Sequence, residues 1–208
     1  MKYKWLNFKK NNKLLLFFNG WGMDENVVQH LNFDNYDVVM FYDYSNLETD
    51  FKIENKYNEA DVIAWSMGVM IAGIVTPKFG LNIKHSTAIN GTAYPIDAKY
   101  GINPKIYDLT IKNFNKQNAE KFIENMFNCQ VPKILRFHLH RTTENQKNEL
   151  IALKQYKGNP EFTYNKVLIS KKDKIIPAKN QSSFWKIEPN LNAGHCPFFD
   201  FTHWSELL

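Results

Sequence analysis

The stretch Ala60–Val75 constrains the fold of this chain more than any other part of its sequence. Residues 62–64 form a short apolar run typical of a buried strand, and the apolar residues after Ser66 predict a helix. So tight a turn crowds the serine against the residues two before and two after it, and Ala64 and Gly68 are small enough for both places. The stretch therefore predicts a nucleophile elbow, a sharp turn that exposes a serine at the carboxyl end of a strand.

The residues around Ser66 also have a plainer interpretation. A serine here can cap an ordinary buried helix, and the usual elbow pattern has glycine where this chain has Ala64. A catalytic serine needs an acid and a histidine, which follow it along the chain in this kind of fold, each just after a strand. Asp173 follows the apolar run 166–170, although a surface turn is an alternative for it, and His195 ends a later loop. Both partners thus occur in the required order.

Length and composition limit the class of protein. The chain has 208 residues, enough for one domain with a substantial core and one insertion. Its two cysteines, Cys129 and Cys196, are too few for a disulfide framework and fit a reducing compartment. The first residues do not resemble a secretory signal, and the longest apolar stretch, residues 62–75, is interrupted and too short to span a bilayer. We expect a cytoplasmic protein with no membrane partner.

The charge of the chain is modest. A net charge of +5 results from 26 basic and 21 acidic residues, and the lysines are scattered among asparagines. Nucleic-acid binding needs basic and aromatic residues gathered in one patch, so we expect no nucleic-acid partner. The composition fits a solvated surface or, alternatively, an acidic partner or substrate.

Apolar runs recur along the chain and predict further strands. They fall at residues 3–9, 13–18, 36–42, 60–65, 83–90, 166–170 and 184–187. A helix-like pattern covers residues 24–31. Strand and helix alternate, which predicts an α/β fold with a mostly parallel central sheet flanked by helices.

A glycine turn, Asn19–Gly22, ends the second of these strands. Folds with an elbow place one amide of their oxyanion hole at such a turn and the other directly after the serine, so we assign these amides to Trp21 and Met67. A simple turn before a helix capped by Asp24 would explain the same residues. Asp43 follows the next strand but precedes the serine, and we expect it at the surface or hydrogen-bonded to the elbow loop.

The alternation stops between residues 91 and 165. Apolar residues recur there at helical spacing over 119–127 and again over 150–153. We interpret residues 91–165 as a helical lid inserted between two parts of a hydrolase-like core, residues 1–90 and 166–208. Its apolar faces serve for packing, and some of them line the mouth of a site beneath.

The insert contains both arginines of the chain, Arg136 and Arg141, and the alternating histidines His138 and His140. The arginines suit fork-shaped anchors for a carboxylate or a phosphate. The histidines are spaced like a metal pair, but the sequence offers no third ligand near them, so we expect no metal.

If Ser66, Asp173 and His195 converge, their chemistry follows. His195 takes the proton of the serine hydroxyl, while Asp173 holds the imidazole in the right tautomer and stabilises its charged form. The amides of Trp21 and Met67 would bind the oxyanion, each such donor being worth about 3 kcal/mol. This is ester or thioester hydrolysis through an acyl-enzyme, and it requires no metal or organic cofactor.

With these residues in view, the chain resembles the α/β-hydrolase superfamily over nearly its full length. Within it, the chain is similar to the BioG-type pimeloyl-[acyl-carrier protein] methyl ester esterases. The segments that carry the closer resemblance are Phe17–Asp24, Trp65–Val69, Ile89–Asp97 and Gly194–Phe198. The first and third are distinctive, and the other two are widely shared. Many superfamily members have histidine where Asn19 stands.

The resemblance implies an enzyme of biotin synthesis. It would remove the methyl group that masks the pimeloyl terminus while the acyl chain is attached to its carrier protein. Ser66, Asp173 and His195 would take the triad positions, and Trp21 and Met67 would supply the oxyanion amides.

An acyl-carrier protein is acidic, so basic residues at the rim of the lid could hold it. The candidates are Lys133, Arg136, Arg141 and Lys147. Two other functions stay open at this point. One is a different acyl-thioester or carboxylester hydrolase or acyltransferase with the same triad, and the other is a non-catalytic binding protein with a hydrolase-like fold.

Overall fold

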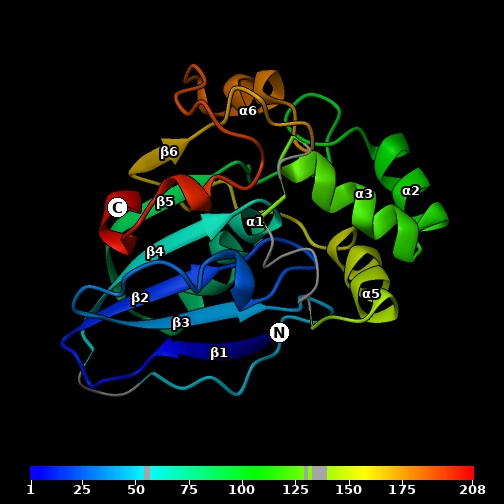
Figure 1. Cartoon of the computed structure of the whole chain (residues 1–208). Helices are drawn as coiled ribbons and strands as arrows, with labels where there is room; N and C mark the ends of the chain where they lie inside the picture. Colours follow the sequence, from blue (N-terminus) through cyan, green and yellow to red (C-terminus); the bar gives the residue numbers. More distant parts are fainter. Residues whose placement is uncertain (54–56, 129–130, 133–139) are drawn as a thin grey trace.

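The computed structural model describes residues 1–53, 57–128, 131–132 and 140–208 (Figure 1). Within these residues six strands form one sheet in the order β1-β3-β2-β4-β5-β6. The strands are β1 (Lys2–Asn7), β2 (Lys13–Phe18), β3 (Tyr36–Tyr42), β4 (Glu59–Trp65), β5 (Asn82–Ile89) and β6 (Lys166–Leu168). The edge strand β1 is antiparallel to β3, and the other pairs in the sheet are parallel. This confirms the predicted mostly parallel α/β sheet.

The central strands are buried on both faces of the sheet. In β2, Leu16 and Phe18 belong to the apolar cluster that contains helix α1 (Met67–Val75), whereas Leu15 and Phe17 belong to the cluster on the opposite face. That second cluster is closed mainly by 3-10 helices, η1 (Glu25–Val27), η3 (Phe198–Asp200) and η4 (Trp204–Leu207). Burial of both faces explains why these strands are continuous apolar runs in the sequence.

The helix predicted over residues 24–31 is wrong. The chain forms only the single turn η1 there and then continues in turns to the end of the predicted helix. Asp24 nevertheless caps that turn, because its Oδ1 accepts a hydrogen bond of 3.0 Å from the backbone N–H of Asn26.

The strand predicted over residues 184–187 is also wrong. Phe184 lies in helix α6 (Ala178–Trp185), and Trp185 ends it. The aromatic rings that suggested a strand pack edge-on outside the sheet: the centroid of Phe184 lies 5.8 Å from that of Tyr94. The apolar signal came from ring packing rather than from strand pairing.

Among the described residues, three helices lie between β5 and β6 in the chain. They are α2 (Pro104–Asn113), α3 (Lys116–Met126) and α5 (Thr143–Leu153). Figure 1 shows them gathered beyond the carboxyl ends of the parallel strands. Each begins at a residue whose side chain accepts a backbone N–H of the first turn, namely Asn103, Asn115 and Thr142. None of the helices in the described residues has the length and apolar character needed to cross a bilayer.

Candidate active site

Ser66 lies at the turn between β4 and α1, in a backbone conformation that residues with a side chain rarely adopt. Its φ is 58° and its ψ is −125°, which costs about 1–3 kcal/mol and is maintained only by the surrounding structure. Two glycines let other backbone approach this turn. A Cβ on Gly68 would lie 2.3 Å from the carbonyl oxygen of Phe18, and one on Gly91 would lie 2.3 Å from the carbonyl oxygen of Ser66. The geometry of the turn is that of an elbow rather than of an ordinary helix cap.

The three residues predicted to converge do lie together. The Oγ of Ser66 is 2.8 Å from Nε2 of His195, and Nδ1 of the same ring is 2.8 Å from Oδ2 of Asp173. All three are buried, with exposed fractions of 5%, 1% and 8% for Ser66, His195 and Asp173. The arrangement can pass a proton from the hydroxyl to the imidazole and stabilise the resulting charge.

The carboxylate of Asp173 is fixed by more than its histidine. Its Oδ1 accepts the backbone N–H groups of Ile175 and Ile176 at 2.8 and 3.0 Å, and its Oδ2 also accepts Nε2 of Gln181 at 2.9 Å. Gln181 is fully buried in α6. The sequence alone does not single out Gln181, because its role depends on α6, and the predicted strand over residues 184–187 overlaps the end of that helix.

The loop that carries His195 is tied to two neighbouring strands. The carbonyl oxygen of His195 accepts Nε1 of Trp65 at 2.8 Å and Nδ2 of Asn90 at 2.9 Å. Asn90 in turn exchanges hydrogen bonds with Ser170, just beyond β6. Trp65 and Asn90 belong to the segments that carry the family resemblance, but no role for either is predicted from the sequence.

Trp21 and Met67 line the same pocket as Ser66. Among the residues that the structure describes, neither of their backbone N–H groups has a hydrogen-bond partner. Free amides beside a nucleophile are what stabilisation of an oxyanion requires. Asn19 shapes the first of these loops, because its side chain accepts the N–H of Gly20 at 2.8 Å and donates to the carbonyl oxygen of Asp24 at 2.9 Å.

The pocket above Ser66 is small and mostly apolar. Its volume is about 220 Å³, below the roughly 300–1,000 Å³ of sites for drug-sized ligands. Ile106 of α2, Phe122 of α3 and Leu150 of α5 line it, and Lys174 adds one positive charge. The volume and the mostly apolar lining suit a small aliphatic group.

The predicted partner-binding residues lie in different environments. Arg141 is not at the rim: its side chain is 4% exposed, and it pairs with Glu149 at 2.7 Å and with Asp43 at 3.3 Å. The expectation that Arg141 reaches a partner is therefore wrong, because its guanidinium is already used inside the protein. Lys147 lies on α5 and is partly exposed. Lys133, Arg136 and also His138 are outside the described residues.

Asp43 is another correction. It was expected at the surface or bonded to the elbow loop, but it is buried beside Arg141. Burial acts to raise the pKa of its carboxyl, but hydrogen bonds from Lys2, Ser45 and Asn145 outweigh burial and lower that pKa.

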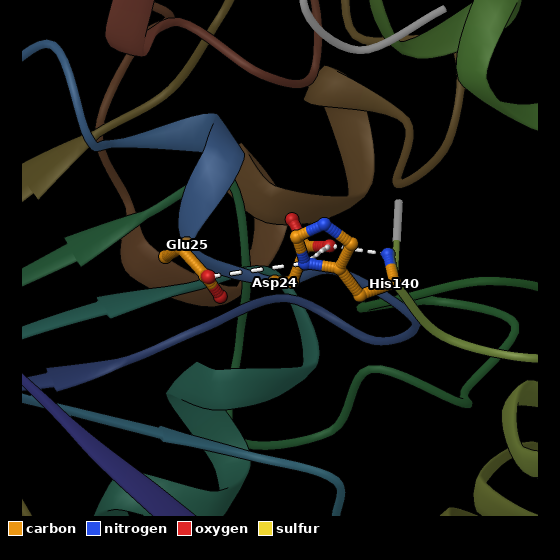
Figure 2. A group of neighbouring side chains, drawn as sticks. All are labelled: Asp24, Glu25 and His140. Carbon is orange, nitrogen blue, oxygen red and sulfur yellow. Dashed lines mark hydrogen bonds and ion pairs between the residues drawn. The ribbon is translucent and has the colours of Figure 1, made fainter. Parts of the chain in front are cut away.

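His140 has two acidic neighbours that the sequence did not reveal. Figure 2 shows its imidazole facing the carboxylates of Asp24 and Glu25, each 3.9 Å from Nδ1. The backbone N–H of His140 also donates to Asp24 at 2.7 Å. Burial acts to raise the pKa of Glu25, but a hydrogen bond from Lys4 reverses the shift, so this carboxylate already has a cationic partner. The cluster ties η1 to the chain at residue 140, and we assign it no metal.

Solved structures of other proteins share the fold. A hydrolase from Oleispira antarctica superposes with a TM-score of 0.68 at 16% identity, covering 99% of this chain and 90% of that one. A lipase-esterase related protein from Clostridium acetobutylicum gives 0.65 at 16% identity, covering 94% and 92%. Likeness at this level of identity establishes the α/β-hydrolase fold, as predicted.

The model of the family described as pimeloyl-ACP methyl esterase BioG matches residues 1–207. The chain belongs to the BioG family. A crystal structure of BioG from Haemophilus influenzae superposes with a TM-score of 0.87 at 32% identity, covering 100% of this chain and 99% of that one. The resemblance seen in the sequence is thus confirmed.

Another relative has a name that refers to a different activity. A malonyl-[acyl-carrier protein] O-methyltransferase from Bacteroides fragilis is 40% identical over 177 residues, which is 83% of this chain. The matched part is 36% of the length of that relative, so this chain spans about a third of it.

Proposed function

We propose that this member of the BioG family is a serine esterase that hydrolyses the methyl ester of pimeloyl-[acyl-carrier protein]. Its product would be the free pimeloyl carboxylate used in biotin synthesis. The observation that carries the proposal is the Ser66–His195–Asp173 relay, whose serine lines a mostly apolar pocket together with Trp21 and Met67.

The proposed reaction follows from this geometry. Ser66 attacks the ester carbonyl while His195 accepts its proton, and the two amides bind the oxyanion of the tetrahedral intermediate. His195 then returns the proton to the leaving methoxide, so methanol departs and the acyl-enzyme remains. Water, deprotonated by His195, attacks the acyl-enzyme and releases the carboxylate. Asp173 stabilises the charged imidazole in both halves.

The apolar pocket supports an acyl substrate whose ester lies at the far end of a methylene chain. Ile106, Phe122 and Leu150 offer aliphatic and aromatic contacts but few polar partners, so the methylated terminus suits them better than a charged carboxylate.

The carrier protein as partner is supported by the family description and by the name of the B. fragilis relative, both of which refer to an acyl-carrier protein. That second name describes methyl transfer. We favour hydrolysis for this chain because a Ser-His-Asp relay serves acyl transfer, and because the chain matches only 36% of the length of that relative. Lys133, Arg136 and Lys147 remain the proposed contacts to the acidic carrier.

The test is to incubate the protein with methyl-pimeloyl carrier protein and measure the mass of the intact carrier. We expect the loaded carrier to lose one CH2 unit and methanol to appear. Ser66→Ala should abolish both changes, whereas Ser205→Ala, an exposed serine far along the chain, should not. Loss of the whole acyl group would identify a thioesterase instead, and an unchanged carrier would refute the proposed substrate.

A further inference from the structure

Helix α5 holds the loop that presents the Trp21 amide. Nε1 of Trp21 donates to the carbonyl oxygen of Gln146 at 2.8 Å. Nε2 of Gln146 donates to the carbonyl oxygen of Gly22 at 3.0 Å, and the N–H of Gly22 donates to Oε2 of Glu149 at 3.0 Å. One helix thus binds the loop at three points, all on Trp21 and Gly22. The peptide group between these two residues comes directly after the N–H of Trp21 along the chain.

Glu149 joins this loop to a second one. Its side chain is fully buried, and its Oε1 accepts the N–H of Tyr44 at 2.9 Å, in the loop after β3. Nη1 of Arg141 lies 2.7 Å from Oε2. A buried carboxylate costs several kcal/mol unless it is paired and hydrogen-bonded, and this one satisfies both conditions.

A general tie between α5 and the core would explain a buried ion pair. It would not explain why three hydrogen bonds of α5 end on residues 21 and 22, whereas the N–H of Trp21 itself donates no hydrogen bond within the described parts of the chain. Gly22 adopts φ of +74°, and a Cβ there would lie 3.3 Å from Nε2 of Gln146. The contacts leave one amide free and fix the peptide next to it.

We propose that Glu149 and Gln146 are positioning residues that fix the Trp21 amide for the oxyanion, so that α5 is a fixed part of the active site rather than a part that opens. The inference rests on the proposed serine hydrolysis. A donor contributes to the transition state only where its position is set beforehand, and a shift of about 1 Å can cost a hundredfold in rate.

The experiment uses p-nitrophenyl butyrate, which needs no carrier protein. Glu149→Gln keeps the shape of the side chain but turns an NH2 group toward donors, and Gln146→Met removes the bond to Gly22 without changing charge. We expect kcat to fall roughly tenfold to a hundredfold in Glu149→Gln and about fivefold in Gln146→Met, with KM within about twofold of wild type. Glu144→Gln, exposed on the same helix, is the control for charge and should behave as wild type.

A second readout separates positioning from general destabilisation. A trifluoromethyl ketone forms an oxyanion on the serine, so its inhibition constant should rise in proportion to the loss of kcat/KM. Thermal melting shows which variants are folded at the assay temperature. If Glu149→Gln is unfolded there, Gln146→Met decides.

The proposal is overturned if the folded variants keep kcat within twofold of wild type. It is also overturned if their inhibition constant for the ketone stays unchanged. If Ser66→Ala still hydrolyses the butyrate ester at the wild-type rate, the proposed function fails instead, so the two failures are distinguishable.

Discussion

The two walls of the Ser66 pocket are built in different ways. On one wall, Ser66 follows β4 and Asp173 lies shortly after β6, and both strands pair with β5 between them. Parallel pairing alone brings these strand ends together. On the other wall, the Trp21 loop follows β2 but is held by hydrogen bonds to residues of α5, more than a hundred residues away. One wall depends on sheet topology and the other on long-range side-chain contacts.

This difference predicts how a mutation in each wall affects the protein. The relay wall is fixed by backbone that the whole sheet stabilises. Substitution of its side chains should therefore lower catalytic activity without lowering the stability of the fold. The wall formed with α5 depends on a buried carboxylate and an amide, so damage there should change geometry and the response to pH.

The largest expected effect comes from Asp173→Asn on the relay wall. The amide keeps the shape of the carboxylate but favours the wrong histidine tautomer, so kcat should fall by about 10⁴-fold. The melting temperature should change little, which steady-state kinetics and a thermal melt can check together. A fall of less than tenfold would mean that Asp173 does not serve His195.

Gly68→Ala tests the backbone part of the same wall. Its Cβ would lie 2.3 Å from the carbonyl oxygen of Phe18, so β2 and α1 must move apart. We expect the free energy of unfolding to fall by about 3 kcal/mol, measured by urea denaturation. Gly80→Ala is the matched control, since a Cβ there meets nothing within 4 Å and only its φ of +67° opposes the change. Equal losses at both positions would contradict a tightly packed elbow.

Gln181→Met should have a smaller effect on the relay wall. It removes the hydrogen bond from Nε2 to Asp173 but leaves the carboxylate with His195 and two backbone N–H groups. Loss of one such bond corresponds to about 1.4 kcal/mol, so kcat/KM should fall roughly tenfold. Gln29→Met, at an exposed glutamine, should leave kcat/KM unchanged.

The smallest effect is a difference in pH dependence within the α5 wall. Burial raises the pKa of Glu149, and the charge of Arg141 only partly offsets this, whereas the pKa of Asp43 is lowered. The stability contributed by protonated Glu149 is fully present below pH 4.5 and is lost as pH rises through its folded pKa. The contribution of Asp43 has the opposite sign, being present above pH 3.8 and lost as pH falls.

Urea denaturation of Glu149→Gln and Asp43→Asn across this range measures both contributions. Relative to wild type, Glu149→Gln should become more stable as pH rises, and Asp43→Asn should become less stable. Parallel pH profiles for the two variants would show that the carboxylates are not shifted in opposite directions.

The sequence was sufficient to predict the relay wall because its signals are local. An apolar run, a serine between small residues and a histidine at the end of a loop are each recognised from a short segment. The parallel pairing of the strands then brings these segments together at one edge of the sheet. The family resemblance added the same residues independently. The role of Gln181 could not be predicted, because its partner Asp173 lies eight residues away, before helix α6. The predicted strand over residues 184–187 also overlaps the end of that helix.

The α5 wall could not be predicted because no local pattern joins Glu149 to Gly22 or Arg141 to Asp43. Arg141 looked like a surface anchor for the same reason, since its burial depends on the folded position of Glu149. Helix α2 is not predicted from the sequence because it has no buried apolar stripe. Tyr107 is its one buried residue, whereas Ile106 and Leu109 are exposed.

The most direct test of the account is labelling with a fluorophosphonate, followed by peptide mapping. The reagent reacts with a serine only if a histidine activates it and an oxyanion site receives the phosphoryl oxygen. We predict that the label lies on Ser66, that Ser66→Ala takes up none, and that His195→Gln slows labelling by at least about a hundredfold. Labelling at another serine, or an undiminished rate in His195→Gln, would contradict the account.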